Sequence, residues 1–468
     1  MPEAKIGLLS VYFGLFDDAM PAGFRQSRER FADEVRRRLA DHGEVVALPL
    51  VDGPERAAEA GAVLAAASVD VVMFAPTMAA PPAWMERVLE GQEAPLVVLC
   101  AQETGSVPDD YDTEAATARS LPVGVVMATN VLVRRGRPFS SVVGEWGSPE
   151  LEASLDRALR AAIAVATLRS KPLLQVGEPM DGYGDVVATE DELARLGVRT
   201  VPIAAEELAV AFQEVSPERL GAVVDEVRSD ADTDAAAVAD EVLSRSCRLS
   251  AALESLCDAR QVCGGTVNCH GPMLRWNPDV GITACLGVTR LSARGMPFSC
   301  TGDIVTAIAL VLGKAIAGAA LYCELYQMDI GGDWMLVANG GEGDPAARAP
   351  GAPLRLLPED HYRGQHGPGV AAAFELSEGP ATLTSLTPVA SAVGGWRMVV
   401  AEGQIVGSRH HRMEGPNAMF RFSGAPVADA YRDWCRAGAT HHAALLPGYR
   451  AEEIGCAAEL LGIEWTAV

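Results

Sequence analysis

The chain has 468 residues, of which 49% are hydrophobic and 21% are charged. This balance is typical of a globular protein and excludes a disordered one, and the length predicts two or three domains. The 38 basic residues face 62 acidic ones, which gives a net charge of -24. A field of that sign repels phosphate backbones, so we predict no nucleic-acid partner.

The N-terminal segment and the cysteines indicate where the protein resides. The first twenty residues lack the basic region, the long apolar region and the cleavage site of a signal peptide. No uninterrupted apolar run reaches the ~18 residues of a membrane span. The 10 cysteines are scattered without a CxxC pair, which indicates reduced thiols and not a disulfide framework. We therefore predict a cytoplasmic protein with no membrane partner.

Apolar strands alternate with helices through the first domain, predicted to span residues 1–169. Strands are predicted at 5–11, 44–48, 69–75 and 94–100, and helices at 24–42, 53–68, 84–91 and 150–169. This alternation predicts a doubly wound parallel sheet. Ligands of such sheets bind at the C-terminal strand ends, which makes Tyr12, Thr77 and Gln102 candidate ligand contacts. No GxGxxG or Walker A sequence follows these strands, so no nucleotide cofactor is indicated.

The pattern continues and then changes along the rest of the chain. A second α/β domain is predicted for 170–338, with strands at 171–176 and 199–203 and helices at 217–228, 235–259 and 304–316. From 339 to 468, Gly- and Pro-rich turns separate short strands at 370–375, 381–386 and 397–401, ahead of a helix at 425–436. Short strands between turns predict an antiparallel barrel or sandwich. The expected fold is two doubly wound α/β domains followed by a C-terminal β-rich, barrel-like domain.

Two carboxylates stand out in the densest stretch of polar and glycine residues, 264–344. Asp303 directly precedes the predicted helix 304–316, so an N-terminal cap explains it without catalysis. Glu324 ends a short apolar strand predicted at 319–323. A carboxylate there loses its hydration unless it has a partner, and a metal, a substrate or an arginine would serve.

The adjacent pair His441 and His442 is the second candidate group. Neighbouring side chains point to opposite sides of an extended chain, so we expect at most one of the two to reach a given site. The pair follows Gly438 and precedes an apolar run at 443–446, which suits a loop that delivers one imidazole into a cleft. Carboxylates with a neutral imidazole favour a hard or borderline divalent ion such as Mn²⁺.

These segments together resemble a known family. The YFGLFD loop, VDVVMFAPTMAAPPAW and VVLCAQE resemble the first domain of L-fucose/L-arabinose isomerase-like proteins. The segments NCHGPMLRWNPDVGITAC, MPFSCTGDIVTAIALVLG, GPATLTSL, GPNAMFRF and THHAALLPG resemble the remainder. The likeness covers nearly the whole chain, and the order of the motifs is its most specific feature.

The resemblance implies both an assembly and a chemistry. Members of the family have two α/β domains and a β-rich C-terminal domain, and form trimers or hexamers with active sites at subunit contacts. They interconvert aldoses and ketoses with a divalent cation, commonly Mn²⁺, held by two acidic residues and a late histidine. By resemblance, Glu324 is the second acidic ligand and His442 is preferred as the histidine. A homo-oligomeric sugar isomerase is thus expected.

The chain departs from this pattern at the first acidic ligand. That position falls on Thr301, in the sequence Cys300-Thr-Gly-Asp303. A further histidine of arabinose isomerases falls near Asn339 or Gly340. Three readings follow: Asp303 takes over as ligand, the metal is bound more weakly, or the chemistry has changed.

The isomerase reading assigns roles to the candidate residues. Glu324 is expected to be base and metal ligand, and Asp303 the second acid/base or ligand. His442 is expected to be a ligand. Asn268, His270 and His441 are expected to bind sugar hydroxyls, and Tyr12, Thr77 and Gln102 to bind the sugar chain across a subunit contact.

The basic cluster around Arg409 and Arg412 suggests a substrate class. A guanidinium suits bidentate recognition of phosphate, sulfonate or carboxylate, so we hypothesise an anionic sugar such as a sulfonated or phosphorylated hexose. A solvated turn or a subunit salt bridge explains the same cluster. The competing class for the whole chain is a catalytically degenerate cytoplasmic sugar-binding or sensor protein, which the absent glutamate would fit.

Overall fold

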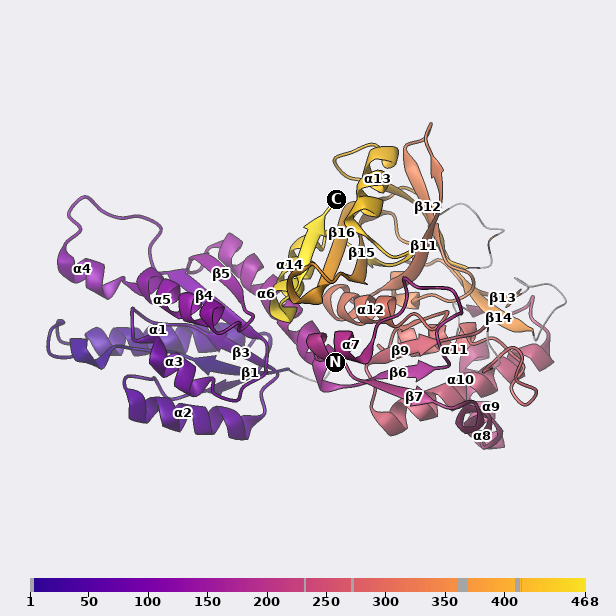
Figure 1. The fold of residues 1–468 in the computed structure, drawn as a ribbon, viewed down its shortest axis with the longest axis horizontal. Coiled ribbons are helices and arrows are strands. Elements are labelled where there is room, and N and C mark those ends of the chain that lie inside the picture. Colours follow the sequence, from indigo (N-terminus) through magenta and orange to yellow (C-terminus); the bar gives the residue numbers. More distant parts are fainter. Residues whose placement is uncertain (1–3, 231–232, 271–272, 360–367, 409–412, 414) are drawn as a thin grey trace. The chain divides into compact units, whose positions relative to one another are not determined.

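The computed structural model divides into two compact units (Figure 1). It describes residues 4–230, 233–270, 273–359, 368–408, 413 and 415–468. Unit 1 comprises Met1–Thr167 and Gly455–Gly462, and unit 2 comprises Leu168–Ile454 and Ile463–Val468. The division into domains at 169 and 338 stays a prediction.

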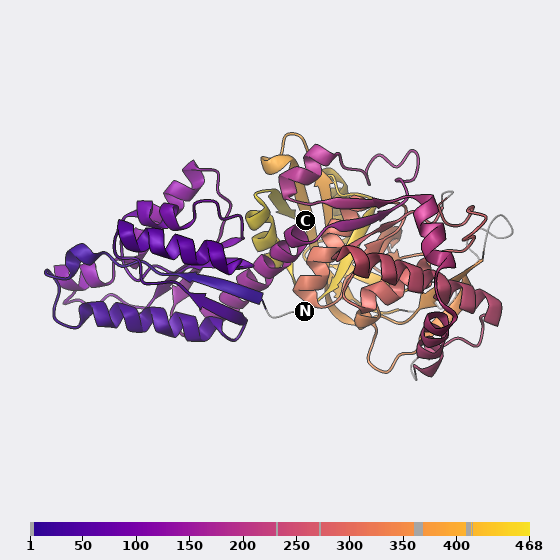
Figure 2. The ribbon, with the colours of Figure 1, turned by 90° about the horizontal axis from the view of Figure 1, so that it is seen from below.

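Unit 1 is built on a five-stranded parallel sheet with the strand order β2-β1-β3-β4-β5. Its strands are β1 (Ala4–Leu9), β2 (Gly43–Ala47), β3 (Val71–Phe74), β4 (Leu96–Gln102) and β5 (Ser140–Glu145). Its helices include α1 (Phe24–Leu39), α2 (Pro54–Ala67), α3 (Pro82–Val88) and α6 (Pro149–Ser170). Figure 2 shows helices on both faces of the sheet. This is the doubly wound arrangement predicted for the segment, with its switch point between β1 and β3.

The sequence analysis missed the elements between residues 113 and 145. These are α4 (Thr113–Ala118), α5 (Leu121–Arg134) and the edge strand β5. One stretch here, Thr113–Arg134, is long and apolar enough to cross a membrane by length and composition alone, whereas no such run was expected. The structure breaks this stretch at Arg119 and Ser120, because Pro122 in the first turn of α5 has no N–H to continue the helix from α4.

Unit 2 begins with a second parallel sheet, ordered β10-β9-β6-β7. Its strands are β6 (Leu173–Val176), β7 (Thr200–Ile203), β9 (Gly264–Val267) and β10 (Phe298–Ser299). Its helices are α7 (Glu190–Leu196), α8 (Ala205–Gln213), α9 (Pro217–Ser229), α10 (Asp240–Arg260), α11 (Cys285–Ala293) and α12 (Ile304–Ala317). The helix α12 is apolar on nearly every side. It packs on β9 and on two later strands, β15 (Gly379–Pro388) and β18 (His442–Pro447), so it connects two sheets.

The C-terminal part closes into an antiparallel barrel. The strand order is β15-β18-β11-β12-β17-β16, with β16 also paired to β15, and β19 is added in parallel to β16. The strands are β11 (Leu321–Asp329), β12 (Trp334–Ala338), β15 (Gly379–Pro388), β16 (Trp396–Ile405), β17 (Asn417–Phe422), β18 (His442–Pro447) and β19 (Glu464–Ala467). Closure pairs every strand of the ring on both sides and fills its interior with apolar side chains. The predicted fold class, including its barrel-like part, is therefore confirmed.

Further short elements complete the chain (Figure 1). The helices α13 (Val427–Ala437) and α14 (Ala451–Leu461) flank β18 in sequence, and β8 (Thr233–Asp234), β13 (Leu354–Glu359) and β14 (Gly369–Ala373) form a three-stranded sheet. The predicted strand at 370–375 and helix at 425–436 thus exist with shifted ends. The strands β13, β17 and β19 were not predicted, because they carry little regular alternation.

We predict that the buried carboxylate of Asp344 fixes the junction between α12 and β11. Its Oδ2 accepts hydrogen bonds from Lys314 Nζ at 2.7 Å and from the Ala320 amide at 3.0 Å. Replacing Asp344 with Ala leaves a partly buried ammonium unpaired, so the free energy of unfolding should fall by about 3 kcal/mol. Urea denaturation measures this, with Asp429→Ala as control, because its ion pair to Arg432 is half exposed and should contribute less than ~1 kcal/mol. Equal effects of the two substitutions would contradict the assignment.

Candidate metal centre

Two neighbouring barrel strands, β11 and β18, bring the site together. Glu324 lies inside β11, directly opposite His442 of β18 on one side and Ala338 of β12 on the other. The predicted strand end at 323 is therefore wrong. The strand runs on to Asp329 with a bulge between Leu325 and Gln327, so cross-strand register brings Glu324 and His442 together although 118 residues separate them.

His442 lies between two carboxylates. Its Nδ1 is 2.8 Å from Asp303 Oδ2 and its Nε2 is 3.1 Å from Glu324 Oε1, and the imidazole is almost fully buried. Burial lowers the pKa of His442, but the hydrogen bonds and charges of Asp303 and Glu324 outweigh it and raise that pKa to about 9. A cation that binds Nε2 therefore displaces the proton that Nε2 shares with Glu324.

Asp303 has two structural partners. It is the N-cap of α12, because its Oδ1 accepts from the Thr306 amide at 2.8 Å, and its Oδ2 accepts from His442. The predicted cap is thus confirmed. Metal binding by Asp303 is disfavoured, because its carboxylate is fully buried and both of its oxygens already accept hydrogen bonds. The geometry favours a positioning role, in which Asp303 holds Nδ1 and turns Nε2 toward Glu324.

His441 reaches the same place, contrary to expectation. The two imidazole rings lie 3.7 Å apart between centroids. His441 precedes the first residue of β18 and is not extended like it, so strand alternation does not separate the two side chains. The His441 ring is held by Asp185, whose Oδ2 lies 2.6 Å from Nδ1 and accepts from the His441 amide at 2.9 Å.

The resulting group offers a divalent cation three donors. One ligand atom each of Glu324, His441 and His442 lies within 4.8 Å of the others. A carboxylate holds Nδ1 of each histidine, as is usual for metal-binding imidazoles. Burial raises the pKa of Glu324, but its hydrogen bonds with His442 and Tyr326 lower it overall, which keeps the carboxylate ionised. One carboxylate with two imidazoles fits a hard or borderline divalent ion.

Thr301 lies at the edge of this group in an unusual conformation. Its φ is +57°, in the left-handed region that a β-branched residue rarely adopts. Its hydroxyl donates to the Cys300 carbonyl at 2.7 Å and lies 3.4 Å from the Tyr322 hydroxyl. Strain of this kind, about 1–3 kcal/mol, typically persists at functional sites. The side chain supplies no carboxylate.

The loop at 177–185 links this group to a cavity of unit 2. Asp185 ends the loop at His441, and the Met180 amide donates to the Thr301 carbonyl at 2.9 Å. At the other end, Asn268 Nδ2 donates to the Glu178 carbonyl at 2.7 Å. Asn268 and His270, both predicted sugar contacts, line a cavity of about 550 Å³ there. The sequence analysis missed Asp185, which no motif marks.

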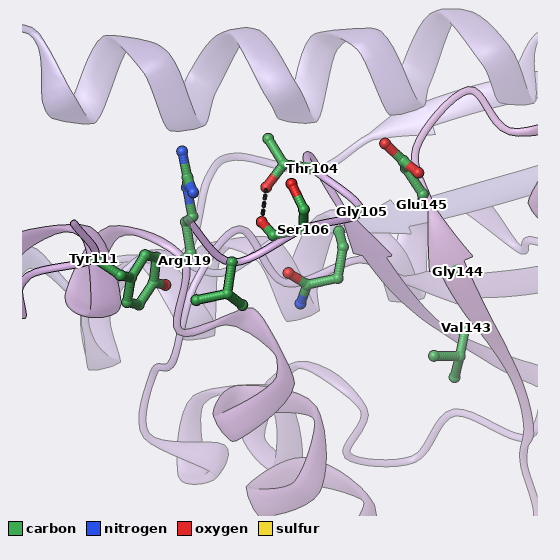
Figure 3. Close-up of a pocket in the computed structure, with 10 residues that line it drawn as sticks. Thr104, Gly105, Ser106, Tyr111, Arg119, Val143, Gly144 and Glu145 are labelled. Atoms are coloured by element: carbon green, nitrogen blue, oxygen red, sulfur yellow. Dashed lines mark hydrogen bonds between the residues drawn. The ribbon is translucent and has the colours of Figure 1, made fainter. Parts of the chain in front are cut away.

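The candidate residues of unit 1 lie at its strand ends, but two of the three are buried. The Tyr12 hydroxyl donates to Asp17 Oδ1 at 2.8 Å, and the Thr77 hydroxyl donates to the Val11 carbonyl at 2.8 Å. Contact with a sugar would require these bonds to be released. Gln102 instead lines an open cavity of about 460 Å³ with Thr104, Ser106, Tyr111, Arg119 and Glu145 (Figure 3). The predicted Arg409 and Arg412 lie outside the described residues.

Comparison with known proteins agrees with this arrangement. Residues 319–464 match the family of the L-arabinose isomerase C-terminal domain, a segment that contains Glu324, His441 and His442. An L-arabinose isomerase of Anoxybacillus flavithermus is 24% identical over 415 residues, covering 85% of this chain and 80% of that protein. One from Geobacillus thermodenitrificans is 25% identical with the same coverage, and one from Acidothermus cellulolyticus is 24% identical over 416 residues.

Two solved structures match the chain at low sequence identity and low TM-score. A periplasmic solute-binding protein of Actinobacillus succinogenes with bound D-allose is 12% identical, covering 67% of this chain and 92% of that one, at a TM-score of 0.17. A solute-binding protein of Burkholderia multivorans is 10% identical, also at a TM-score of 0.17. Scores this low do not indicate a shared overall arrangement.

The fold and the site define a class: an α/β protein whose C-terminal barrel carries a cluster of histidines and a glutamate suited to a divalent cation. The matched C-terminal segment and the relatives confirm the predicted resemblance of the chain to the L-fucose/L-arabinose isomerase-like family.

His442 should make stability depend on pH when metal is removed by a chelator. Its pKa is 6.5 as an ordinary histidine and about 9 in the fold, so its contribution to stability is complete below pH 6.5. That contribution is lost as the pH rises toward about 9, because the folded state then gives up its extra proton. Urea denaturation in EDTA at pH 6 and pH 9.5 measures the difference. His442→Gln should show a smaller decrease, and an equal decrease would contradict the assignment.

Proposed function

We propose that this chain is an aldose–ketose isomerase that uses a divalent cation, with Mn²⁺ the preferred candidate, and moves a proton between C1 and C2 of a sugar. The observation that carries the proposal is the convergence of Glu324, His441 and His442 on one point. The activity of the L-arabinose isomerase relatives supports the same reaction type.

The three converging residues would hold the cation. Bound there, it supplies Lewis-acid stabilisation of the charge that develops on the C1 and C2 oxygens. Asp185 and Asp303 keep the two imidazoles in the orientation that directs Nε2 inward. Most of the geometry is thus set before a ligand arrives.

Glu324 is the proposed base. Its side chain is about one-third exposed, so one face is open to a ligand while the other is held by His442. Because its pKa is lowered overall, the carboxylate is ionised at neutral pH and can accept the C2 proton. Proton transfer by such a group contributes roughly 10²–10⁴-fold to the rate.

The substrate class rests on fewer observations. Three carboxylates, Asp185, Asp303 and Glu324, carry negative charge around the site. An anionic hexose would therefore depend on Arg409 and Arg412, which lie outside the described residues, and it stays a hypothesis beside neutral aldoses. The trimeric or hexameric assembly and the cytoplasmic location also stay predictions.

Glu324→Gln should abolish turnover, with kcat reduced by at least ~10²-fold. The assay measures ketose formation from a panel of neutral and anionic aldoses with Mn²⁺, together with the bound metal. His270→Gln is the control, because its cavity lies at the far end of the 177–185 loop and metal binding should persist. Absence of metal dependence and of turnover in the wild type would favour the sugar-binding reading.

A further inference from the structure

Tyr183 is an exposed aromatic residue that packs against the candidate metal centre. Its exposed fraction is 37%. Its ring meets that of His441 edge to face, with 5.1 Å between the ring centroids and 90° between the planes, and His441 is one of the three converging donors. Asp185 holds the His441 imidazole and its amide by hydrogen bonds. The orientation of His441 is therefore already set without the tyrosine ring.

The chain holds Tyr183 in place from both sides. Three residues before it, the Met180 amide donates to the Thr301 carbonyl at 2.9 Å. The Tyr183 amide then closes a turn by donating to the Met180 carbonyl at 3.2 Å, and Gly182 has a φ of +85° in the third position, where a positive φ favours glycine. The contact of Asp185 with the metal centre follows two residues later. The ring is thus positioned before a ligand arrives, which lowers the entropic cost of binding.

The ring borders the side of the metal centre that a ligand can reach. His442 is almost fully buried, whereas the side chains of His441 and Glu324 are 38% and 32% exposed. A ligand of the centre therefore approaches from the side of these two residues. Tyr183 packs against one of them and is itself exposed, so its ring lies beside the approach.

An aromatic ring at this place suits the apolar part of a sugar. The three donors of the centre are one carboxylate and two imidazoles, which can contact the hydroxyl and carbonyl oxygens of an aldose through a cation or by hydrogen bonds. The same aldose carries carbon-bound hydrogens between its hydroxyls, and packing these on an aromatic face removes apolar surface from water. Ligand sites typically combine such apolar or aromatic walls with a few polar groups.

We propose that the Tyr183 ring forms one wall of the sugar site and packs on the C–H groups of the bound aldose; this inference rests on the proposed function. Tyr183 is then a substrate-binding residue that takes no part in proton transfer or in metal binding. A wall of this kind contacts the sugar equally before and during the reaction, so it contributes to affinity and not to kcat.

Tyr183→Ala and Tyr183→Phe separate the role of the ring from that of the hydroxyl. Calorimetric titration of the Mn²⁺-loaded protein with arabinitol and with sorbitol, sugar alcohols that have no carbonyl to isomerise, measures binding without turnover. We expect Tyr183→Ala to weaken the binding roughly tenfold and Tyr183→Phe to stay within about threefold of the wild type. Mn²⁺ affinity and the melting temperature should be unchanged in both variants. The control is Tyr449→Ala, which removes an exposed tyrosine of the same unit whose hydroxyl accepts from Gln404 and should leave binding unchanged.

Several results would overturn the proposal. One is a sugar-alcohol affinity of Tyr183→Ala within about threefold of the wild type, and another is a wild type that binds neither sugar alcohol. Loss of Mn²⁺ affinity in Tyr183→Ala would also overturn it, because the ring would then act through His441. With an aldose that is turned over, KM should rise roughly tenfold in Tyr183→Ala, and a fall in kcat at constant KM would contradict the assignment.

Failure of the proposed function gives a different result. Sugar-alcohol binding that depends on Tyr183, in a protein that turns over no aldose, would count against the isomerase and leave Tyr183 as a sugar contact.

Discussion

The carboxylate of Asp303 is the interaction on which the site depends. One of its oxygens begins α12 by accepting from Thr306, and the other holds His442 at the start of β18. Because α12 packs on both the parallel sheet and the barrel, this one fully buried group joins these two parts of unit 2. A charge buried this deeply is tolerated only with such partners, so cap, helix and imidazole stabilise one another.

The electrostatics of the centre follow from that arrangement. Asp303 and Asp185 each hold one Nδ1, which leaves the two Nε2 atoms and Glu324 to face the same point. The two histidines are neighbours in sequence, yet each is oriented by a carboxylate far from it along the chain. The absence of a carboxylate at Thr301 changes which residues can carry protons, but it leaves this set of donors intact.

Much of the fold could be predicted from sequence, and the reasons are local. Apolar runs between amphipathic helices identified both parallel sheets, and closely spaced turns identified the barrel. The segment 113–145 was missed because its helices and edge strand lack a clear period, and Glu324 was placed at a strand end because the polar residues after it belong to an exposed hairpin.

The candidate site was only partly accessible to sequence reasoning, because its geometry is long-range. Residue type and context singled out Asp303, Glu324 and the histidine pair, and the structure brings all four together. The convergence of His441 with His442 depends on where β18 begins, and the partnership with Asp185 crosses 256 residues. Neither is encoded in a local pattern.

The central claim is that His441 and His442 both bind the cation together with Glu324. Pulsed electron paramagnetic resonance of the Mn²⁺-loaded protein tests it directly, because it detects nitrogen nuclei bound to the ion. The account predicts coupling to two imidazole nitrogens, one of which disappears in His441→Gln and the other in His442→Gln. Bound Mn²⁺ without nitrogen coupling, or with a signal unchanged by both substitutions, would contradict it.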